Sequence, residues 1–259
     1  MDIFEEIVAL KKAGTPAVLA TVVEALGSSP GKTSARMLIK ADGSIMGTIG
    51  GGAIEKKMID EAMTIMNGTE SKLLKYSLEE LGMSCGGDMS VFLEPLERAP
   101  ELIIFGAGHI GTALSNICKM LGFTTTVVDN RPEFANTERL PLADRVIADD
   151  YQKVLQDLSF SDTTYIVILT HRHVHDFEIL DYCAKQTFYY LGMIGSRKKV
   201  AKVFQQLKEK GTDEDTIKRI HAPIGIEIGA EKPEEIAVSI AAELVAIRSG
   251  TEISSLKLD

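Results

Sequence analysis

A glycine turn that joins an apolar run to a helical pattern limits the fold of this chain more than any other feature. The turn reads Gly106-Ala107-Gly108-His109-Ile110-Gly111, follows the apolar stretch 102–105 and opens a helix predicted over 110–121. In that context the first glycine permits a tight turn, the second lets a phosphate approach the backbone, and the third lets helix and strand pack closely. Residues from about 101 onward are therefore predicted to form a Rossmann-like nucleotide-binding domain.

Asp129 supports this interpretation, because it ends the next predicted strand, 23 residues after Gly106. An acid that binds a ribose is expected about 20 residues after the turn. The free N–H groups at the start of the helix would then face a phosphate. His109, inside the turn, is predicted either to contact that phosphate or to face solvent. The alternative is a strand–helix unit whose glycines serve packing alone.

The rest of the chain predicts two domains. Short apolar strands separated by helices indicate a parallel sheet covered on both faces, with strands at 102–105, 124–128, 144–147, 165–170 and 189–194, and helices over 197–210 and from Pro233. The first half predicts helices over 3–13 and 53–66, strands at 17–23, 36–40, 45–48 and 73–76, and an edge strand at 90–94. A polar connector spans 95–100. We therefore expect an α/β protein with a small N-terminal α+β domain (1–97) and a Rossmann-like parallel-sheet domain (98–259).

Composition restricts the partners and the compartment. A formal net charge of -9 argues against nucleic acid and anionic membranes as partners. No apolar run approaches the ~20 residues that span a bilayer, and the acidic N-terminus does not resemble a signal peptide. The three cysteines form no CxxC pair and their number is odd, so a disulfide framework is not expected. Cys118 and Cys183 lie in apolar helical patterns and are predicted to be core residues. These features predict a cytoplasmic protein.

Three histidines at alternate positions, His171, His173 and His175, follow the strand predicted at 165–170, and Asp176 comes next. If the segment stays extended, alternate side chains lie on one side. They would then sit at the C-terminal edge of a parallel sheet, where ligands bind. Because imidazoles and a carboxylate suit zinc or iron, the pattern predicts a metal site. The alternative is that the histidines cap the following helix or line a pocket.

A second glycine junction, Gly195-Ser196-Arg197-Lys198, precedes another predicted helix. Ser196 is a predicted N-cap. Arg197 and Lys198 place positive charge at a helix N-terminus, which the helix dipole disfavours. A bound anion would offset this conflict, whereas the alternative is a solvated basic pair.

The first domain contains three segments of small residues. Those at 27–31 and 49–55 could form anion-binding nests of backbone N–H groups, or simply tight turns. In the third segment, Cys85 stands beside Gly86 and Gly87. The Cys85 thiolate could ligate a soft metal or attack sulfur, and the alternative is a small buried hydrophobic residue.

Taken together and in this order, the motifs resemble the XdhC/CoxI family, the accessory factors of xanthine dehydrogenase and related molybdenum hydroxylases. The resemblance covers nearly the whole chain and rests on segments 27–31, 47–55, 85–87, 105–111, 169–171, 190–198 and 221–225. It implies binding of molybdenum cofactor, as molybdopterin or as its dinucleotide. It also implies support for sulfuration of the cofactor by a cysteine desulfurase and delivery to an apo molybdenum hydroxylase.

Residues are assigned to the cofactor on the same resemblance. Those predicted to bind it are Gly27, Ser28, Ser29, Gly31, Gly50, Gly51, Gly52, Glu55, Cys85, Gly86, Gly87, Gly106, Gly108, His109, Gly111, Asp129, Gly195, Ser196, Arg197 and Lys198. Cys85 is also a candidate contact for molybdenum or its sulfido ligand. The candidate metal ligands are Cys85, His171, His173 and His175.

The leading interpretation is a maturation factor without turnover of its own. A second is an NAD(P)-dependent oxidoreductase, based on the glycine turn and Asp129. A third is a metal-dependent hydrolase that uses the cluster from His171 to Asp176. A homodimer is a further hypothesis, because a carrier of a buried cofactor needs a cleft and a two-fold pair is the commonest assembly that could form one.

Overall fold

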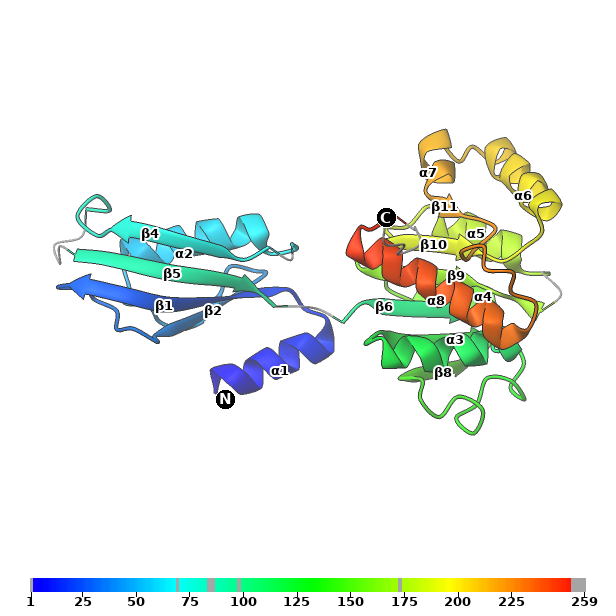
Figure 1. Ribbon diagram of the computed structural model, residues 1–259, viewed down its shortest axis with the longest axis horizontal. Coiled ribbons are helices and arrows are strands. Elements are labelled where there is room, and N and C mark those ends of the chain that lie inside the picture. The colour runs from blue at the N-terminus through cyan, green and yellow to red at the C-terminus, as the bar shows by residue number, and fades with distance from the viewer. Residues whose placement is uncertain (1, 69, 83–86, 97–98, 172–173, 253–259) are drawn as a thin grey trace, which may run out of the picture. The chain divides into compact units, whose positions relative to one another are not determined.

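The computed structural model divides into two compact units, residues 1–99 and 100–259, each of which is described by itself (Figure 1). No helix in the described part of the chain has both the length and the apolar character needed to cross a bilayer. The structure describes residues 2–68, 70–82, 87–96, 99–171 and 174–252.

Unit 1 is an antiparallel sheet covered on one face by a helix. Its elements are α1 (Ile3–Ala13), β1 (Ala17–Gly27), β2 (Arg36–Lys40), β3 (Ile45–Gly47), α2 (Ala53–Ile65), β4 (Lys72–Ser77) and β5 (Gly87–Pro95). Over the described residues the five strands lie in the order β3-β2-β1-β5-β4. Alternate residues of β1, such as Val18 and Ala20, share an apolar cluster with Ile54 and Met58 of α2. The core of unit 1 therefore lies between the sheet and α2.

The prediction of an edge strand at 90–94 is wrong. β5 pairs with β1 on one side and with β4 on the other, so it is an interior strand. Its alternate residues Met89, Val91 and Leu93 are buried in the cluster under α2. Pro95 is compatible with this position because it is the last residue of the strand, where one missing N–H donor interrupts little of the ladder.

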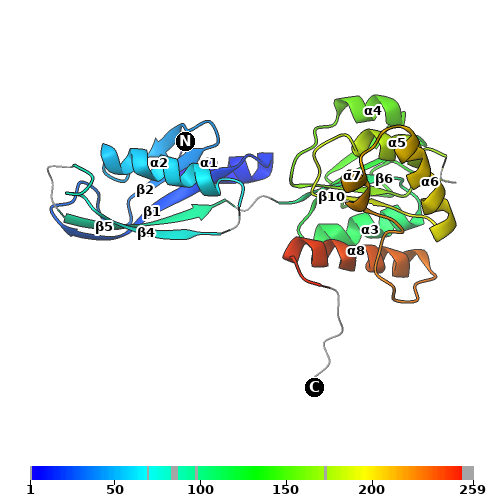
Figure 2. The same ribbon diagram turned by 90° about the horizontal axis from the view of Figure 1, so that it is seen from above.

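Unit 2 is a parallel sheet with helices on both faces. Its elements are β6 (Glu101–Phe105), α3 (His109–Met120), β7 (Thr124–Asp129), β8 (Arg145–Ala148), α4 (Tyr151–Asp157), β9 (Thr164–Ile168), α5 (Asp176–Cys183), β10 (Tyr190–Met193), α6 (Arg197–Glu209), α7 (Glu214–Lys218), β11 (Ile220–His221) and α8 (Pro233–Ser249). Leu102 and Ile104 pack in the cluster with α3 and α8, whereas Ile103 and Phe105 pack with α4 and α5. Figure 2 shows these helix pairs on opposite faces of the sheet. The predicted double-sided parallel sheet is confirmed.

The order of the strands creates a crevice beside β6. Within the described residues the six strands lie in the order β11-β10-β9-β6-β7-β8. From β6 the chain runs outward through β7 to β8, and then returns to place β9 on the other side of β6. Such a switch point, at the C-terminal ends of two adjacent strands, is where open α/β sheets bind ligands. The sixth strand, β11, is too short to show a periodicity that the sequence analysis could detect.

Candidate functional site

A pocket of about 380 Å³ lies at this switch point. Small-molecule sites commonly have volumes of about 300–1,000 Å³, so it can hold part of a phosphorylated ligand. The glycine turn, the end of β9, the loop after β7 and the start of α8 contribute the residues that line it. They are Gly108, His109, Ile110, Gly111, Arg131, Phe134, Leu169, Thr170, His171 and Pro233.

The three glycines of the turn are needed for different steric reasons. Gly106 has a φ of +121°, and a Cβ there would lie 2.3 Å from the backbone oxygen of Leu169. A Cβ on Gly111 would lie 1.9 Å from the backbone oxygen of Gly106. A Cβ on Gly108 would meet no atom within 4 Å, so this position faces open space. The positive φ of Gly106 fits the predicted tight turn, the close approach at Gly111 fits the predicted packing, and Gly108 leaves room for a ligand to approach the backbone.

The N-terminus of α3 lies at this open position without a side-chain cap. Its N-cap residue is Gly108, which has no side chain, and its first turn contains no acidic residue. The first N–H groups of a helix lack partners within the helix and carry the positive end of its dipole. Together with the free space beside Gly108, this end of α3 fits a phosphate group. His109 is exposed next to it.

Asp129, the predicted ribose ligand, has no exposed surface. Its Oδ2 accepts hydrogen bonds from the Ala107 N–H at 2.8 Å and from Arg131 Nη2 at 2.8 Å. Its Oδ1 accepts from the Arg131 backbone N–H at 3.1 Å and from Arg131 Nε at 2.8 Å. Burial acts to raise the pKa of Asp129, but the bonds from Arg131 and Ala107 outweigh burial and lower the pKa. A ribose contact would require this carboxylate to release some of its present donors.

The lowered pKa predicts an acid-dependent loss of stability. The stabilisation by Asp129 should be complete above the unfolded carboxyl pKa near 4, and should be lost as the pH falls through the lower folded pKa. Denaturant unfolding of the native chain and of Asp129→Asn, measured between about pH 3 and pH 7, tests this. The difference in unfolding free energy between them should shrink below about pH 4. A constant difference would contradict the prediction.

Asp176, from the predicted metal cluster, is buried and tied to other residues. Its Oδ1 accepts a 2.5 Å bond from the Thr170 hydroxyl and a 3.2 Å bond from the Thr170 N–H. Its Oδ2 pairs with the ammonium group of Lys199. These contacts connect the ends of β9, α5 and α6. Sequence reasoning missed Lys199, because only its ion pair with a residue on another helix distinguishes it from its basic neighbours.

The predicted basic pair at the start of α6 is exposed to solvent. Ser196 is confirmed as the N-cap, since its side chain accepts from the Lys199 N–H at 3.3 Å. Arg197 and Lys198 follow on the exposed side, and Gly195 packs against the stem of Lys199. The four residues predicted to bind the cofactor here, Gly195, Ser196, Arg197 and Lys198, do not line the pocket at the glycine turn.

The histidine segment does not stay extended where the structure describes it. β9 ends at Ile168, and the Val174 N–H donates to the His171 carbonyl at 3.4 Å. The helix α5 begins at Asp176 with His175 as its N-cap residue, so the segment between β9 and α5 is a turn and not an extended strand. The turn leaves His171 at the pocket, and it places His175 beside the Tyr151 ring, 5.2 Å between centroids.

No metal-binding group of three His, Cys, Asp or Glu side chains forms among the described residues. Cys85, Gly86 and His173 lie outside the described residues. A metal ligand role for Cys85 or His173 therefore stays a prediction.

The small-residue segments of unit 1 meet at one place. A Cβ on Gly31 would lie 2.0 Å from the backbone oxygen of Ile49, and one on Gly50 would lie 2.7 Å from the Gly31 nitrogen. A Cβ on Gly87 would lie 3.3 Å from the backbone oxygen of Ser28. The three motifs predicted separately in the first domain are therefore neighbours, and their glycines permit backbone to approach backbone.

The chain's own Glu55 occupies the nest predicted at the second of these segments. Its Oε1 accepts from the Thr48 hydroxyl at 2.5 Å, from the Gly51 N–H at 3.0 Å and from the Ile49 N–H at 3.1 Å. Burial acts to raise the pKa of Glu55, but these hydrogen bonds outweigh it and lower the pKa. An external anion on these N–H groups would have to displace Glu55.

The predicted residues Gly27 and Ser29 belong to the first of the small-residue segments. Gly27 is the last residue of β1, and Ser29 lies in a turn where its hydroxyl donates to the Gly31 carbonyl.

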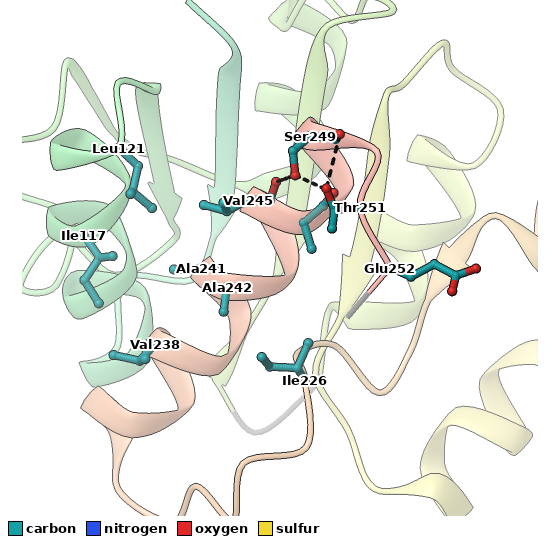
Figure 3. Close-up of a pocket in the computed structure, with 11 residues that line it drawn as sticks. Ile117, Leu121, Ile226, Val238, Ala241, Ala242, Val245, Ser249, Thr251 and Glu252 are labelled. Carbon is teal, nitrogen blue, oxygen red and sulfur yellow. Dashed lines mark hydrogen bonds between the residues drawn. The ribbon is translucent and has the colours of Figure 1, made fainter. Parts of the chain in front are cut away.

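A second hollow, of about 480 Å³, lies along α3 and α8, away from the glycine turn. Figure 3 shows mainly aliphatic side chains around it, including Ile117, Leu121, Val238 and Val245. Its hydroxyl groups bond to nearby backbone carbonyls rather than converging on the hollow. Its one carboxylate among the lining residues belongs to the exposed Glu252, and no Lys, Arg or His lines it to bind a phosphate, so we place the candidate site at the glycine turn.

The parallel sheet, the switch-point pocket and the glycine turn define unit 2 as a Rossmann-type domain. The family model described as the XdhC Rossmann domain matches residues 102–244. The model described as the XdhC and CoxI family matches residues 10–77. The chain belongs to the XdhC/CoxI family.

Three curated relatives are similar over most of the chain. The protein from Escherichia coli (strain K12) named "Uncharacterized protein YqeB" is 36% identical over 96% of this chain, which spans only 47% of that relative. A protein from Bacillus subtilis (strain 168), named as a probable xanthine dehydrogenase subunit, is 24% identical over 90% of this chain and 93% of its own length. "Molybdenum cofactor insertion chaperone PaoD" of Escherichia coli (strain K12) is 24% identical over 93% of this chain and 86% of its own length.

A solved structure has a similar fold. It is described as a xanthine dehydrogenase from Bacillus halodurans, and it aligns with a TM-score of 0.53 at 24% identity. The alignment covers 99% of this chain and 98% of that one.

Proposed function

We propose that this chain binds molybdenum cofactor and acts as an accessory factor for a xanthine dehydrogenase-type molybdenum enzyme. The observation that carries the proposal is the uncapped N-terminus of α3, which opens at Gly108 into a pocket at the switch point. The phosphate of molybdopterin suits this end of the helix. The names of two relatives, a molybdenum cofactor insertion chaperone and a probable xanthine dehydrogenase subunit, support the choice of cofactor and of partner.

The finer proposal concerns the partners. A cysteine desulfurase supplies sulfur for the cofactor, and the loaded chain delivers it to an apo molybdenum hydroxylase without turnover of its own. Cys85 is the proposed contact for molybdenum. The neighbouring loops that contain Ser28 and Gly50, together with Gly87 at the start of β5, are proposed to hold the cofactor in unit 1. A homodimer is proposed as the assembly.

A nucleotide-dependent oxidoreductase is the second candidate. The strand order of unit 2 favours this candidate, because dinucleotide-binding domains have the same order of strands in their sheet. His109 and His171 line the pocket, and their imidazole groups could act as general acid or base there. The absorbance of NAD(P)H reports its oxidation. Oxidation that depends on an added substrate would support an oxidoreductase over a cofactor carrier.

Gly108→Ala tests the phosphate site with little risk to the fold. The φ of Gly108 is -69°, which any residue can adopt, and the added methyl group meets no atom of the chain within 4 Å. If a phosphate lies against the turn, the methyl group blocks its approach, and cofactor affinity should fall by about tenfold or more. Native and variant chains are incubated without oxygen with cofactor released from a molybdoenzyme and are then separated from free cofactor. Retained molybdenum is measured by mass spectrometry and retained pterin by fluorescence.

Gly68→Ala is the matched control, because Gly68 lies outside the pocket and its Cβ would have no neighbour closer than 3.5 Å. It should retain as much cofactor as the native chain. A native chain that retains neither molybdenum nor pterin would overturn the carrier proposal. Equal retention by the native chain and Gly108→Ala would place the phosphate away from the glycine turn.

A further inference from the structure

We propose that Arg131, rather than Asp129, contacts the ligand at the edge of the pocket. The pocket would then prefer a ribose that carries a phosphate over a ribose with free hydroxyl groups. The inference goes beyond the proposed cofactor role and rests only on the phosphate site proposed for the glycine turn.

Asp129 has no free acceptor directed at the pocket. In dinucleotide-binding domains, the acid at the end of the second strand accepts hydrogen bonds from the ribose hydroxyl groups. Here each carboxylate oxygen already accepts two bonds from Ala107 and Arg131, and the side chain has no exposed surface. These contacts fix the glycine turn to the loop after β7. Asp129 therefore positions the pocket wall instead of contacting the ligand.

Arg131 lines the pocket and is held in one orientation. Its Nε and Nη2 donate to Asp129, and its guanidinium group lies 3.9 Å from the centroid of the Phe134 ring, which also lines the pocket. No hydrogen bond among the described residues uses its Nη1 group, and 20% of the side chain is exposed. A guanidinium group fixed in this way can bind a phosphate with little further loss of side-chain freedom.

Two guanidinium groups lie over the Phe134 ring. The Asp129–Arg131 pair is neutral as a whole, but the guanidinium group of Arg139 also lies over Phe134, 4.9 Å from the ring centroid. Glu133 also interacts electrostatically with Arg131, so the two guanidinium groups, and not a net positive charge, distinguish this edge of the pocket. Arginine donates hydrogen bonds but cannot accept them, so it pairs more strongly with the charged oxygens of a phosphate than with hydroxyl groups, whose O–H donors it leaves without an acceptor. An arginine near the end of the second strand is also the feature by which dinucleotide folds accept a ribose 2′-phosphate.

Direct binding of two matched pairs of nucleotides tests the inference. The native chain is titrated calorimetrically with NADP+ and NAD+, and then with 2′,5′-ADP and 5′-AMP. Within each pair, the compound with the 2′-phosphate should bind about ten- to a hundredfold more tightly, as expected for new hydrogen bonds between charged groups. Arg131→Gln should remove the preference and Arg131→Lys should keep part of it. Arg139→Gln is the matched control and should keep most of it, because Arg139 stacks on the same ring but does not line the pocket.

The outcomes are distinct from those of the cofactor experiment. Equal affinities within the pairs, or tighter binding of the compounds without the 2′-phosphate, would overturn the inference. A preference that survives Arg131→Gln would overturn the role of Arg131. If no nucleotide binds, the inference also fails, whereas retention of molybdenum and pterin still decides the proposed cofactor role. The comparison on the native chain remains decisive even if Arg131→Gln does not fold.

Discussion

Gly111→Ala is expected to lower the unfolding free energy of unit 2 by about 3 kcal/mol or more, the upper range for overpacking in a core. The added Cβ would lie 1.9 Å from the Gly106 backbone oxygen and 3.1 Å from its carbonyl carbon. Both atoms belong to the backbone, so a change of rotamer cannot remove the overlap. Helix α3 would have to move away from β6, and the apolar cluster around Leu114 and Ile104 would loosen with it.

Thermal unfolding followed by near-ultraviolet circular dichroism measures the effect. The chain has no tryptophan, and all of its tyrosines except Tyr76 lie beyond residue 100, so the signal reports mainly on unit 2. The midpoint should fall by roughly 6–12 °C. Gly108→Ala, three positions earlier in the same turn, is the control and should unfold close to the native temperature because its methyl group meets open space. Equal midpoints for Gly111→Ala and the native chain would contradict the close approach of α3 to β6.

Asp176→Ala is expected to cost about 3–5 kcal/mol, as when one partner of a buried ion pair is removed. The carboxylate is almost completely buried, and it accepts bonds from Thr170 and pairs with Lys199. Without it, the N–H and hydroxyl groups of Thr170 lose their acceptor, and the ammonium group of Lys199 is left with the Ile194 carbonyl at 3.3 Å. The end of β9, which borders the pocket, should therefore become less ordered.

Two further variants define what the ion pair contributes. Asp176→Asn keeps an acceptor for Thr170 but loses the charge, so its stability should lie between those of Asp176→Ala and the native chain. Asp215→Ala removes an ion pair with Lys218 in which both side chains are largely exposed to solvent. It should change the unfolding free energy by less than about 1 kcal/mol. Urea unfolding at neutral pH gives all three values. Similar losses for Asp176→Ala and Asp215→Ala would show that burial of Asp176 does not matter.

Two of the N–H-rich loops that predicted a bound anion are already satisfied by the chain itself. Glu55 occupies the nest at Ile49 and Gly51, and Asp129 accepts the Ala107 N–H inside the Rossmann turn. The physical expectation that such loops bind an anion was sound, but the anion is a carboxylate of the protein. This leaves the start of α3 at Gly108 as the N–H-rich position of unit 2 that faces a pocket.

Local patterns in the sequence determined the class of fold and indicated where the candidate site lies. The alternation of apolar strands and helices predicted the double-sided sheet, because burial on both faces requires continuous apolar strands. The spacing of Gly106, Gly108 and Gly111 predicted their separate steric roles, because each role depends on backbone within a few residues of the turn or on the strand next to it. The N-cap role of Ser196 was also readable, since a cap acts on the turn that follows it.

Contacts between distant residues were decided by the tertiary structure. Arg131 stands close to Asp129 in the sequence, but the Ala107 N–H that also donates to this carboxylate belongs to the glycine turn, and only the fold brings the turn to Asp129. In the same way, only packing makes β5 an interior strand and pairs Asp176 with Lys199. A carboxylate or ammonium group has many potential partners in an extended chain. The folded backbone selects one of them by fixing which groups lose their water together, and sequence spacing carries little of that information.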